Sequence, residues 1–150
     1  MSRFSDCDDY DEDYPNQYAL YQANTDRALK GKRGKAFLLE LEAALLALPE
    51  KKLIEGRICE AGQVCAMGAL ALKRRMSTGE KIEDALRWLE DESPQEAYAY
   101  ETADFMEKHF GILSNLAIRV AHVNDEWARG TPEGRYETVL KWVREELVKS

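Results

Sequence analysis

Four residues of the types that bind zinc stand out in this sequence: Cys59, Cys65, His109 and His122. Short structural zinc motifs place their cysteines or histidines in close, regular pairs. Here five residues separate the two cysteines, and there is no C-x-x-C or H-x-x-x-H pair. This spacing favours buried thiols, because a free cysteine packs like a small apolar side chain. The sequence therefore predicts no metal and no other cofactor.

His122, Asp125 and Glu126 form a second cluster, with the i, i+3, i+4 spacing that places residues on one face of a helix. Such a face could bind a metal ion or position a general base. The favoured interpretation is a solvated helix end, because a metal site needs more ligands than this cluster supplies. His109 is expected in the last turn of another helix, where a positive charge stabilises the helix dipole.

Nucleophilic catalysis finds no support in the sequence. There is no G-x-S-x-G motif. The segment 31–35, Gly-Lys-Arg-Gly-Lys, lacks the G-x-x-x-x-G-K-[ST] spacing of a phosphate-binding loop and has no hydrophobic strand before it. We predict no catalytic residue, and the expectation is that the protein is not an enzyme. An enzyme or metal-binding protein that uses Cys59, Cys65 or His122 remains the weakest of three readings.

Basic residues are concentrated in one short segment that carries five positive charges and no negative one: Arg27, Lys30, Lys32, Arg33 and Lys35. Together with Lys73, Arg74 and Arg75, they are the best candidates for contacts with nucleic-acid phosphates. The alternative is that the segment forms salt bridges with the acidic N-terminal residues of the same molecule. We weigh that alternative slightly higher, because the opposite charges lie so close in the sequence.

The N-terminal segment is acidic and contains several aromatic residues. We predict that residues 1–15 form a flexible tail and that residues 16–150 form a single helical domain. Acidic residues interleaved with aromatics could also dock on a basic partner. The candidate partner-binding residues are Phe4, Asp6, Asp8, Asp9, Tyr10, Asp11, Glu12, Asp13 and Tyr14.

Apolar residues at helical spacing predict the elements that position these groups. Leu38, Leu41, Leu45 and Leu48 mark a helix that ends at Pro49. Further helices are expected from Asn16 to Lys30, with Tyr18, Tyr21 and Leu29 facing inward, and from Ala66 to Met76. A small β-hairpin near residues 53–65 would turn at Gly62. The expected fold is mainly α: a compact bundle of about six or seven helices with that hairpin.

Polar residues indicate where the later helices begin. Ser77 with Glu80, and Ser93 with Pro94 and Glu96, have the pattern of N-terminal caps. Gly111 should end the second of these helices. The two remaining helices are expected to start at Ser114 and after Thr131. The inward residues of the first of these are Leu116, Val120, Val123 and Trp127, and those of the last are Tyr136, Leu140, Val143 and Leu147.

Composition restricts the surroundings in which the chain works. It has 150 residues, 33% of them charged, and a formal net charge of −7. A net negative charge opposes approach to nucleic acid unless a local basic patch overrides it. The sequence has no apolar run long enough to cross a bilayer, and no secretory signal pattern. We expect a cytoplasmic protein that does not engage membranes.

Several stretches taken together resemble a family of small uncharacterised proteins encoded by bacteriophages and prophages. The resemblance covers most of the chain outside residues 73–98. It is carried by the acidic start after Met-Ser-Arg and by the segments 28–38, 48–54, 62–69, 110–112, 124–126, 131–133 and 142–143. It implies a bacterial host cytoplasm during infection or lysogeny. No catalytic residues are assigned in that family, so none carry over.

This setting leads to a ranking of functions. The first hypothesis is a non-enzymatic phage protein that binds a host bacterial protein or complex, as an inhibitor of a defence system. The second is a nucleic-acid-associated protein that uses segment 27–35.

Overall fold

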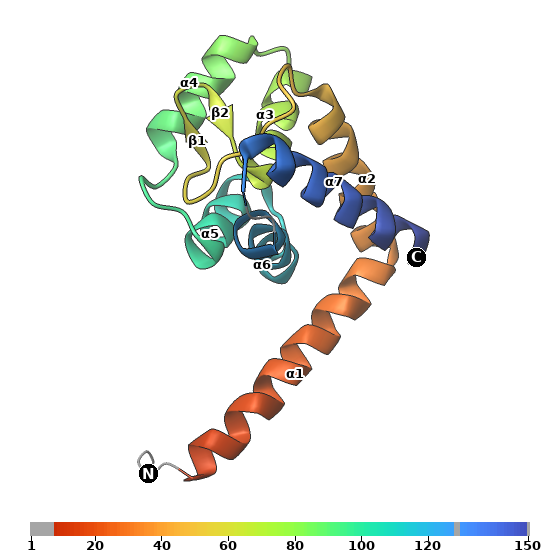
Figure 1. Ribbon diagram of the computed structural model, residues 1–150. Coiled ribbons are helices and arrows are strands. Elements are labelled where there is room, and N and C mark those ends of the chain that lie inside the picture. Colours follow the sequence, from red (N-terminus) through yellow and green to blue (C-terminus); the bar gives the residue numbers. More distant parts are fainter. Residues whose placement is uncertain (1–7, 128–129, 150) are drawn as a thin grey trace.

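The computed structural model describes the backbone of residues 8–127 and 130–149, and the side chains from Gln17 onward within those ranges. The described chain is mainly helical, as predicted (Figure 1). Its helices are α1 (Asp8–Lys30), α2 (Lys32–Ala47), α3 (Ala66–Ser77), α4 (Ile82–Glu92), α5 (Ala99–Phe110), α6 (Ser114–His122) and α7 (Pro132–Lys149). A π-helical turn, η1 (Val123–Trp127), extends α6.

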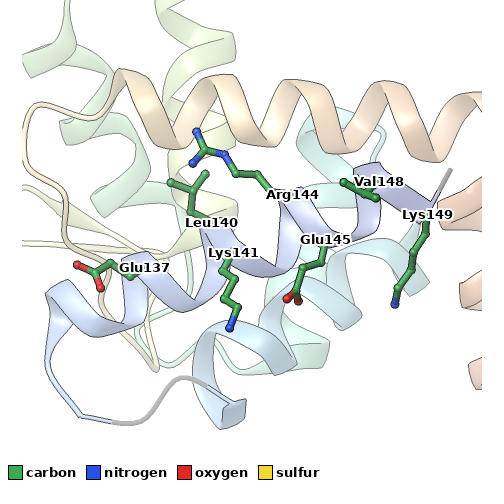
Figure 2. Close-up of a pocket in the computed structure, with 7 residues that line it drawn as sticks. All are labelled: Glu137, Leu140, Lys141, Arg144, Glu145, Val148 and Lys149. Carbon is green, nitrogen blue, oxygen red and sulfur yellow. The ribbon is translucent and has the colours of Figure 1, made fainter.

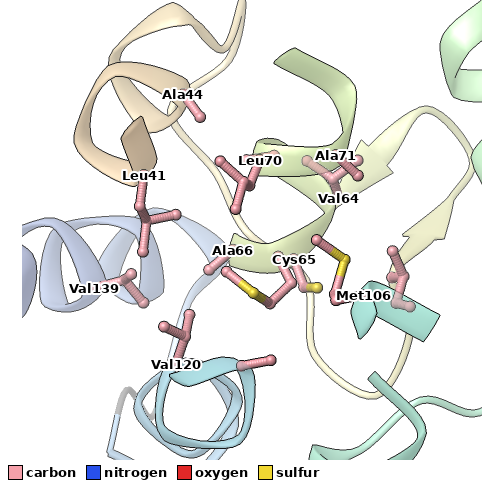
Figure 3. Packing of buried hydrophobic residues seen from close by; sticks show 14 of the residues in the cluster. Leu41, Ala44, Val64, Cys65, Ala66, Leu70, Ala71, Met106, Val120 and Val139 are labelled. Carbon is pink, nitrogen blue, oxygen red and sulfur yellow. The ribbon is translucent and has the colours of Figure 1, made fainter. Parts of the chain in front are cut away.

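Helix α3 is the centre of the bundle. Its first seven residues, 66–72, are all buried, which is expected of a helix that is apolar around its whole circumference. Side chains from α2, α5, α6 and α7 converge on it, represented in Figure 3 by Leu41, Met106, Val120 and Val139. The predicted stripe of four leucines on α2 is buried in the same core, as expected for an amphipathic helix.

The expected hairpin is present and very short. Strand β1 (Cys59–Glu60) pairs with the antiparallel strand β2 (Gln63–Val64), and Ala61 and Gly62 form the turn between them with positive φ angles. The hairpin lies against α3, because the Ile58 carbonyl oxygen would be only 2.3 Å from a Cβ atom at Gly68. Glycine at position 68 is therefore what lets the hairpin approach α3 so closely.

Helix α1 begins at Asp8, not at Asn16, so part of the expected acidic tail is helical. Acidic residues near the first turn favour an earlier start, because the N-terminus of a helix carries partial positive charge. The break to α2 is at Gly31 alone, since Gly34 lies inside α2. Figure 1 shows α1 leaving the bundle and extending well beyond it.

The inward-facing set expected on α1 is partly wrong. Leu29 is buried and Tyr21 is half-buried, but Tyr18 is 63% exposed because it lies where α1 has left the bundle. Trp127 is also exposed, at 57%, whereas Leu116, Val120 and Val123 are buried as expected. A π-helical turn has more residues per turn than an α-helix, so η1 rotates Trp127 away from the buried face.

Two predicted helix caps are wrong. Ser77 ends α3 and donates to the Lys73 carbonyl, and Ser93 ends α4 and donates to the Leu89 carbonyl. Helices α4 and α5 begin later, after Lys81 and Tyr98. The other boundaries follow the prediction: Gly111 ends α5 with φ of 67°, α6 starts at Ser114, and α7 starts at Pro132.

Candidate interaction surfaces

Among the side chains that the structure describes, those in the C-terminal half of α1 attach it to the bundle. Leu29 and Thr25 are buried there, and Arg119 of α6 contacts both Gln22 and Asp26, the latter at 3.1 Å. From Gln17 to Leu20 the described side chains are all exposed, and Leu20 is 62% exposed. The half of α1 from Asp8 to Leu20 forms a projecting arm, and we use this name for it below.

The arm contains most of the acidic candidates from the sequence. Phe4 and Asp6 lie outside the described residues, and so does Cys7. The backbone of the remaining candidates is helical, while their side chains lie outside the described part: Asp8, Asp9, Tyr10, Asp11, Glu12, Asp13 and Tyr14. The structure therefore places five carboxylate-bearing residues within two turns at the far end of the arm.

The basic segment lies at the opposite end of α1, around the elbow at Gly31. All five of its side chains are exposed, and Arg27 donates to Asn24. Arg27 follows Asp13 by fourteen positions, which is about 21 Å along a helix. The expected salt bridges between residues 8–13 and segment 27–35 of the same molecule are therefore wrong, because a continuous helix holds the two charge groups apart.

The second basic group, residues 73–75, is mostly engaged within the fold. The Arg74 guanidinium donates to both carboxylate oxygens of Glu40, at 2.7 and 2.8 Å, and to the Phe110 carbonyl. Arg75 forms a similar bidentate pair with Glu80, at 2.6 and 3.0 Å, and lies 3.8 Å from the Trp88 ring centroid. These two arginines connect neighbouring helices, whereas Lys73 is half-buried.

One surface pocket brings together arginines from both basic groups. Arg33 and Arg74 line it, and Phe37, Ile112 and Leu116 form its apolar walls. Arg74 is already bound to Glu40, so Arg33 supplies the accessible cation. An accessible guanidinium beside apolar walls is the arrangement that binds a ligand with both an anionic group and an apolar part.

The two described cysteines are buried free thiols. Burial raises the pKa of Cys59 to about 11 and that of Cys65 to about 12. A thiol with so high a pKa stays protonated at neutral pH and is a poor nucleophile. Cys65 caps α3, its sulfur accepting from the Gly68 N–H at 3.4 Å. Cys65 therefore has a structural role, because it caps the first turn of the central helix α3.

The predicted cluster of His122, Asp125 and Glu126 does not lie on one face. His122 Nδ1 lies 2.7 Å from a carboxylate oxygen of Glu126, as their i, i+4 spacing predicts. Asp125 faces elsewhere and accepts from the Asn124 side chain at 2.8 Å. His109 is in the last turn of α5, as expected, and packs on Trp88 and Phe105 with centroid distances of 5.2 and 4.5 Å.

A buried polar network that the sequence did not reveal surrounds Asn124 and Arg135. Asn124 accepts from the Ala66 N–H at 3.0 Å and donates to the Ile54 carbonyl at 2.9 Å. Arg135 donates to the carbonyl oxygens of Asn124 and Leu53, both at 3.0 Å, and pairs with Glu55. The network satisfies the backbone of the irregular segment before the hairpin, so its role is structural.

Helix α7 carries a surface groove that is open to solvent (Figure 2). Val148, 85% exposed, and the half-buried Leu140 form its apolar base. Charged side chains rim it, and Arg144 reaches toward α2 to pair with Glu42 at 2.9 Å. The mixed charges of the rim, Glu137, Lys141, Arg144, Glu145 and Lys149, give this groove no net preference for an anion or a cation.

Among the residues that the structure describes, no three His, Cys, Asp or Glu side chains are grouped so that they could hold a metal ion. Within the same ranges, none of the helices combines the length and apolar character needed to span a membrane. No family model, curated protein or solved structure matches this chain.

Proposed function

We propose that this chain is a non-enzymatic interaction protein of phage origin that binds a host bacterial protein through the projecting arm. On this proposal it inhibits a bacterial defence complex. The observation that carries the proposal is the arm itself, a helix that leaves the bundle. Residues 8–13 at its far end are five acidic residues and one aromatic residue, Tyr10.

The arm packs on none of the described core residues. Isolated helical segments of this length are marginal in water, so the arm gains stability when it finds a partner. The arm carries dense negative charge, so the complementary partner surface is basic, and association should be fast and sensitive to salt. The phage setting rests on the resemblance of the sequence, and the host partner follows from that setting.

The test is capture from a lysate of infected bacteria by the protein tagged at its C-terminus. The arm variant replaces Asp8, Asp9, Asp11 and Asp13 by Asn and Glu12 by Gln. A control makes the same change in net charge at five exposed acids of α4 and α5: Glu90→Gln, Asp91→Asn, Glu92→Gln, Asp104→Asn and Glu107→Gln.

We expect the wild type and the control to retain the same host protein at low salt, and the arm variant to lose it. Its melting temperature should stay close to that of the wild type, because the arm lies outside the core. Equal capture by the arm variant would show that the acidic arm is not the binding element.

Nucleic-acid binding is the second candidate, and it is favoured by the exposure of all five basic side chains around Gly31. The relevant variant replaces Lys32, Arg33 and Lys35 by Gln. Binding of labelled DNA or RNA should then weaken, and the dependence of log K on log salt should flatten by about one unit per lost phosphate contact. No binding by the wild type at low salt would eliminate this candidate.

A further inference from the structure

The pocket lined by Arg33 and Arg74 combines an apolar floor with a cationic edge. Phe37, Ile112 and Leu116 form the floor, and each is at most 6% exposed, so these side chains belong to the packed core. A floor made of core side chains is preformed, as small-ligand sites usually are. The pocket volume of about 310 Å³ corresponds to about ten water-sized groups of about 30 Å³ each. It therefore suits a small ligand of about ten non-hydrogen atoms.

Three charged side chains line the pocket, and one of them is available to a ligand. The Arg74 guanidinium donates to both carboxylate oxygens of Glu40, at 2.7 and 2.8 Å, so these two charges cancel. Arg33 is exposed and pairs with no carboxylate among the residues that the structure describes. Its neighbours Lys32 and Lys35 are also exposed and raise the local positive potential, which attracts anions. The pocket thus offers one uncompensated positive charge beside an apolar floor.

A carboxylate fits this charge better than a phosphate does. A guanidinium binds a carboxylate through two parallel N–H···O bonds. A phosphate monoester carries about two negative charges and three acceptor oxygens, and the apolar floor supplies no further donors for them. Helix α6 begins beside the pocket, with Leu113 at its N-cap and no acidic residue in its first turn, so it adds partial positive charge on this side.

We propose that this pocket binds a monocarboxylate with a compact apolar body. The carboxylate pairs with Arg33, the apolar part lies on the floor, and Leu113, which is 46% exposed, covers that part from the side. Two sources share this chemistry: a free apolar carboxylic acid, and the C-terminal residue of a polypeptide that ends in an apolar side chain. No residue of the arm lines the pocket, so this site does not depend on the proposed host-binding function.

Titration of the purified full chain, followed through its amide NMR spectrum, tests the proposal. The probes are 3-phenylpropionate for a free acid and N-acetyl-phenylalanine for a C-terminal residue. We expect saturable shifts centred on Gly111, Ile112 and Leu116, with a dissociation constant below about 1 mM for the better probe. The acid that binds more tightly identifies the source. The corresponding amides should bind at least about tenfold more weakly, because they lack the negative charge.

Two pairs of variants locate the contacts. Arg33→Gln should raise the dissociation constant of the acid by at least about tenfold and leave that of the amide unchanged. Lys35→Gln is the matched control, because it removes the same charge from the same helix at a position outside the pocket. Leu113→Ala should weaken acid and amide alike by about threefold. Its control is Leu39→Ala, since Leu39 is similarly exposed, at 49%, and does not line the pocket.

Melting temperatures check that each variant is folded. The proposal is overturned by an absence of saturable shifts at millimolar probe, by equal binding of acid and amide, or by equal losses from Arg33→Gln and Lys35→Gln. Displacement of the acid by an equal concentration of inorganic phosphate would also overturn it, because the pocket would then be a general anion site.

Discussion

Arg74 and Arg75 are consecutive in the sequence, but they take part in different contacts. Arg74 connects α3 to Glu40 and to the end of α5, while Arg75 pairs with Glu80 and stacks on Trp88. Successive residues on a helix point about 100° apart, so a run of basic residues does not form one patch. Residues 73–75 therefore do not form one basic surface, although Arg74 lines a pocket together with Arg33 of the first basic segment.

Asp125 offers a test at the level of a single charge. Burial raises the pKa of Asp125, and the neighbouring Glu55 carboxylate acts in the same direction. The folded state therefore binds the proton more tightly than the unfolded state. Ionisation of Asp125 costs stability, and this cost develops as the pH rises from the unfolded pKa of about 3.9 through the higher folded value.

We predict that Asp125→Asn stabilises the protein at pH 7 and has a much smaller effect near pH 3.5, where the carboxyl is mostly protonated in both states. The amide oxygen of the new side chain can still accept from Asn124. Urea unfolding at the two pH values measures the difference, and Asp104→Asn on the surface of α5 is the control. A stability gain of equal size at both pH values would contradict the assigned cause.

At the level of elements, the elbow between α1 and α2 depends on Gly34. A Cβ atom there would lie 2.0 Å from the Ala28 carbonyl oxygen and 2.6 Å from the Leu29 Cα. Both are backbone atoms, so no flexible side chain can move aside. Gly34 therefore fixes how closely the end of α1 packs against the start of α2, and with it the direction of the arm.

We predict that Gly34→Ala destabilises the fold by about 3 kcal/mol, at the upper end of overpacking costs. Gly31→Ala is a matched control in the same elbow. Its Cβ would meet nothing closer than 3.8 Å, and φ is an ordinary −77°. A change below about 0.5 kcal/mol is expected for it. Equal destabilisation of the two variants in urea unfolding would show that the close approach at Gly34 is not decisive.

The buried faces of the helices could be predicted from the sequence. A helix that packs on a core by one side repeats its apolar residues every three or four positions. Leu38, Leu41 and Leu45 follow that period and are fully buried. The first residues of the helices were harder to predict, because a side chain that could cap a helix can bind another partner instead. Glu80, expected in a capping box with Ser77, is bound to Arg75.

Long-range polar contacts could not be predicted in this way. Asn124 accepts from Ala66 across 58 positions of the sequence, and no local pattern signals such a contact. The exposed apolar side of α2 did have a signal, the 3-4-3 spacing of Ala36, Leu39, Ala43 and Leu46. It was overlooked because the buried leucines on the other side of the same helix explained the apolar content of the segment.

At the level of the whole molecule, the two charge groups of the N-terminal region lie far apart. The basic segment surrounds the elbow at Gly31, and the acidic end of the arm lies at the far end of α1. A partner of the arm and a partner of the basic segment would therefore meet different parts of the molecule.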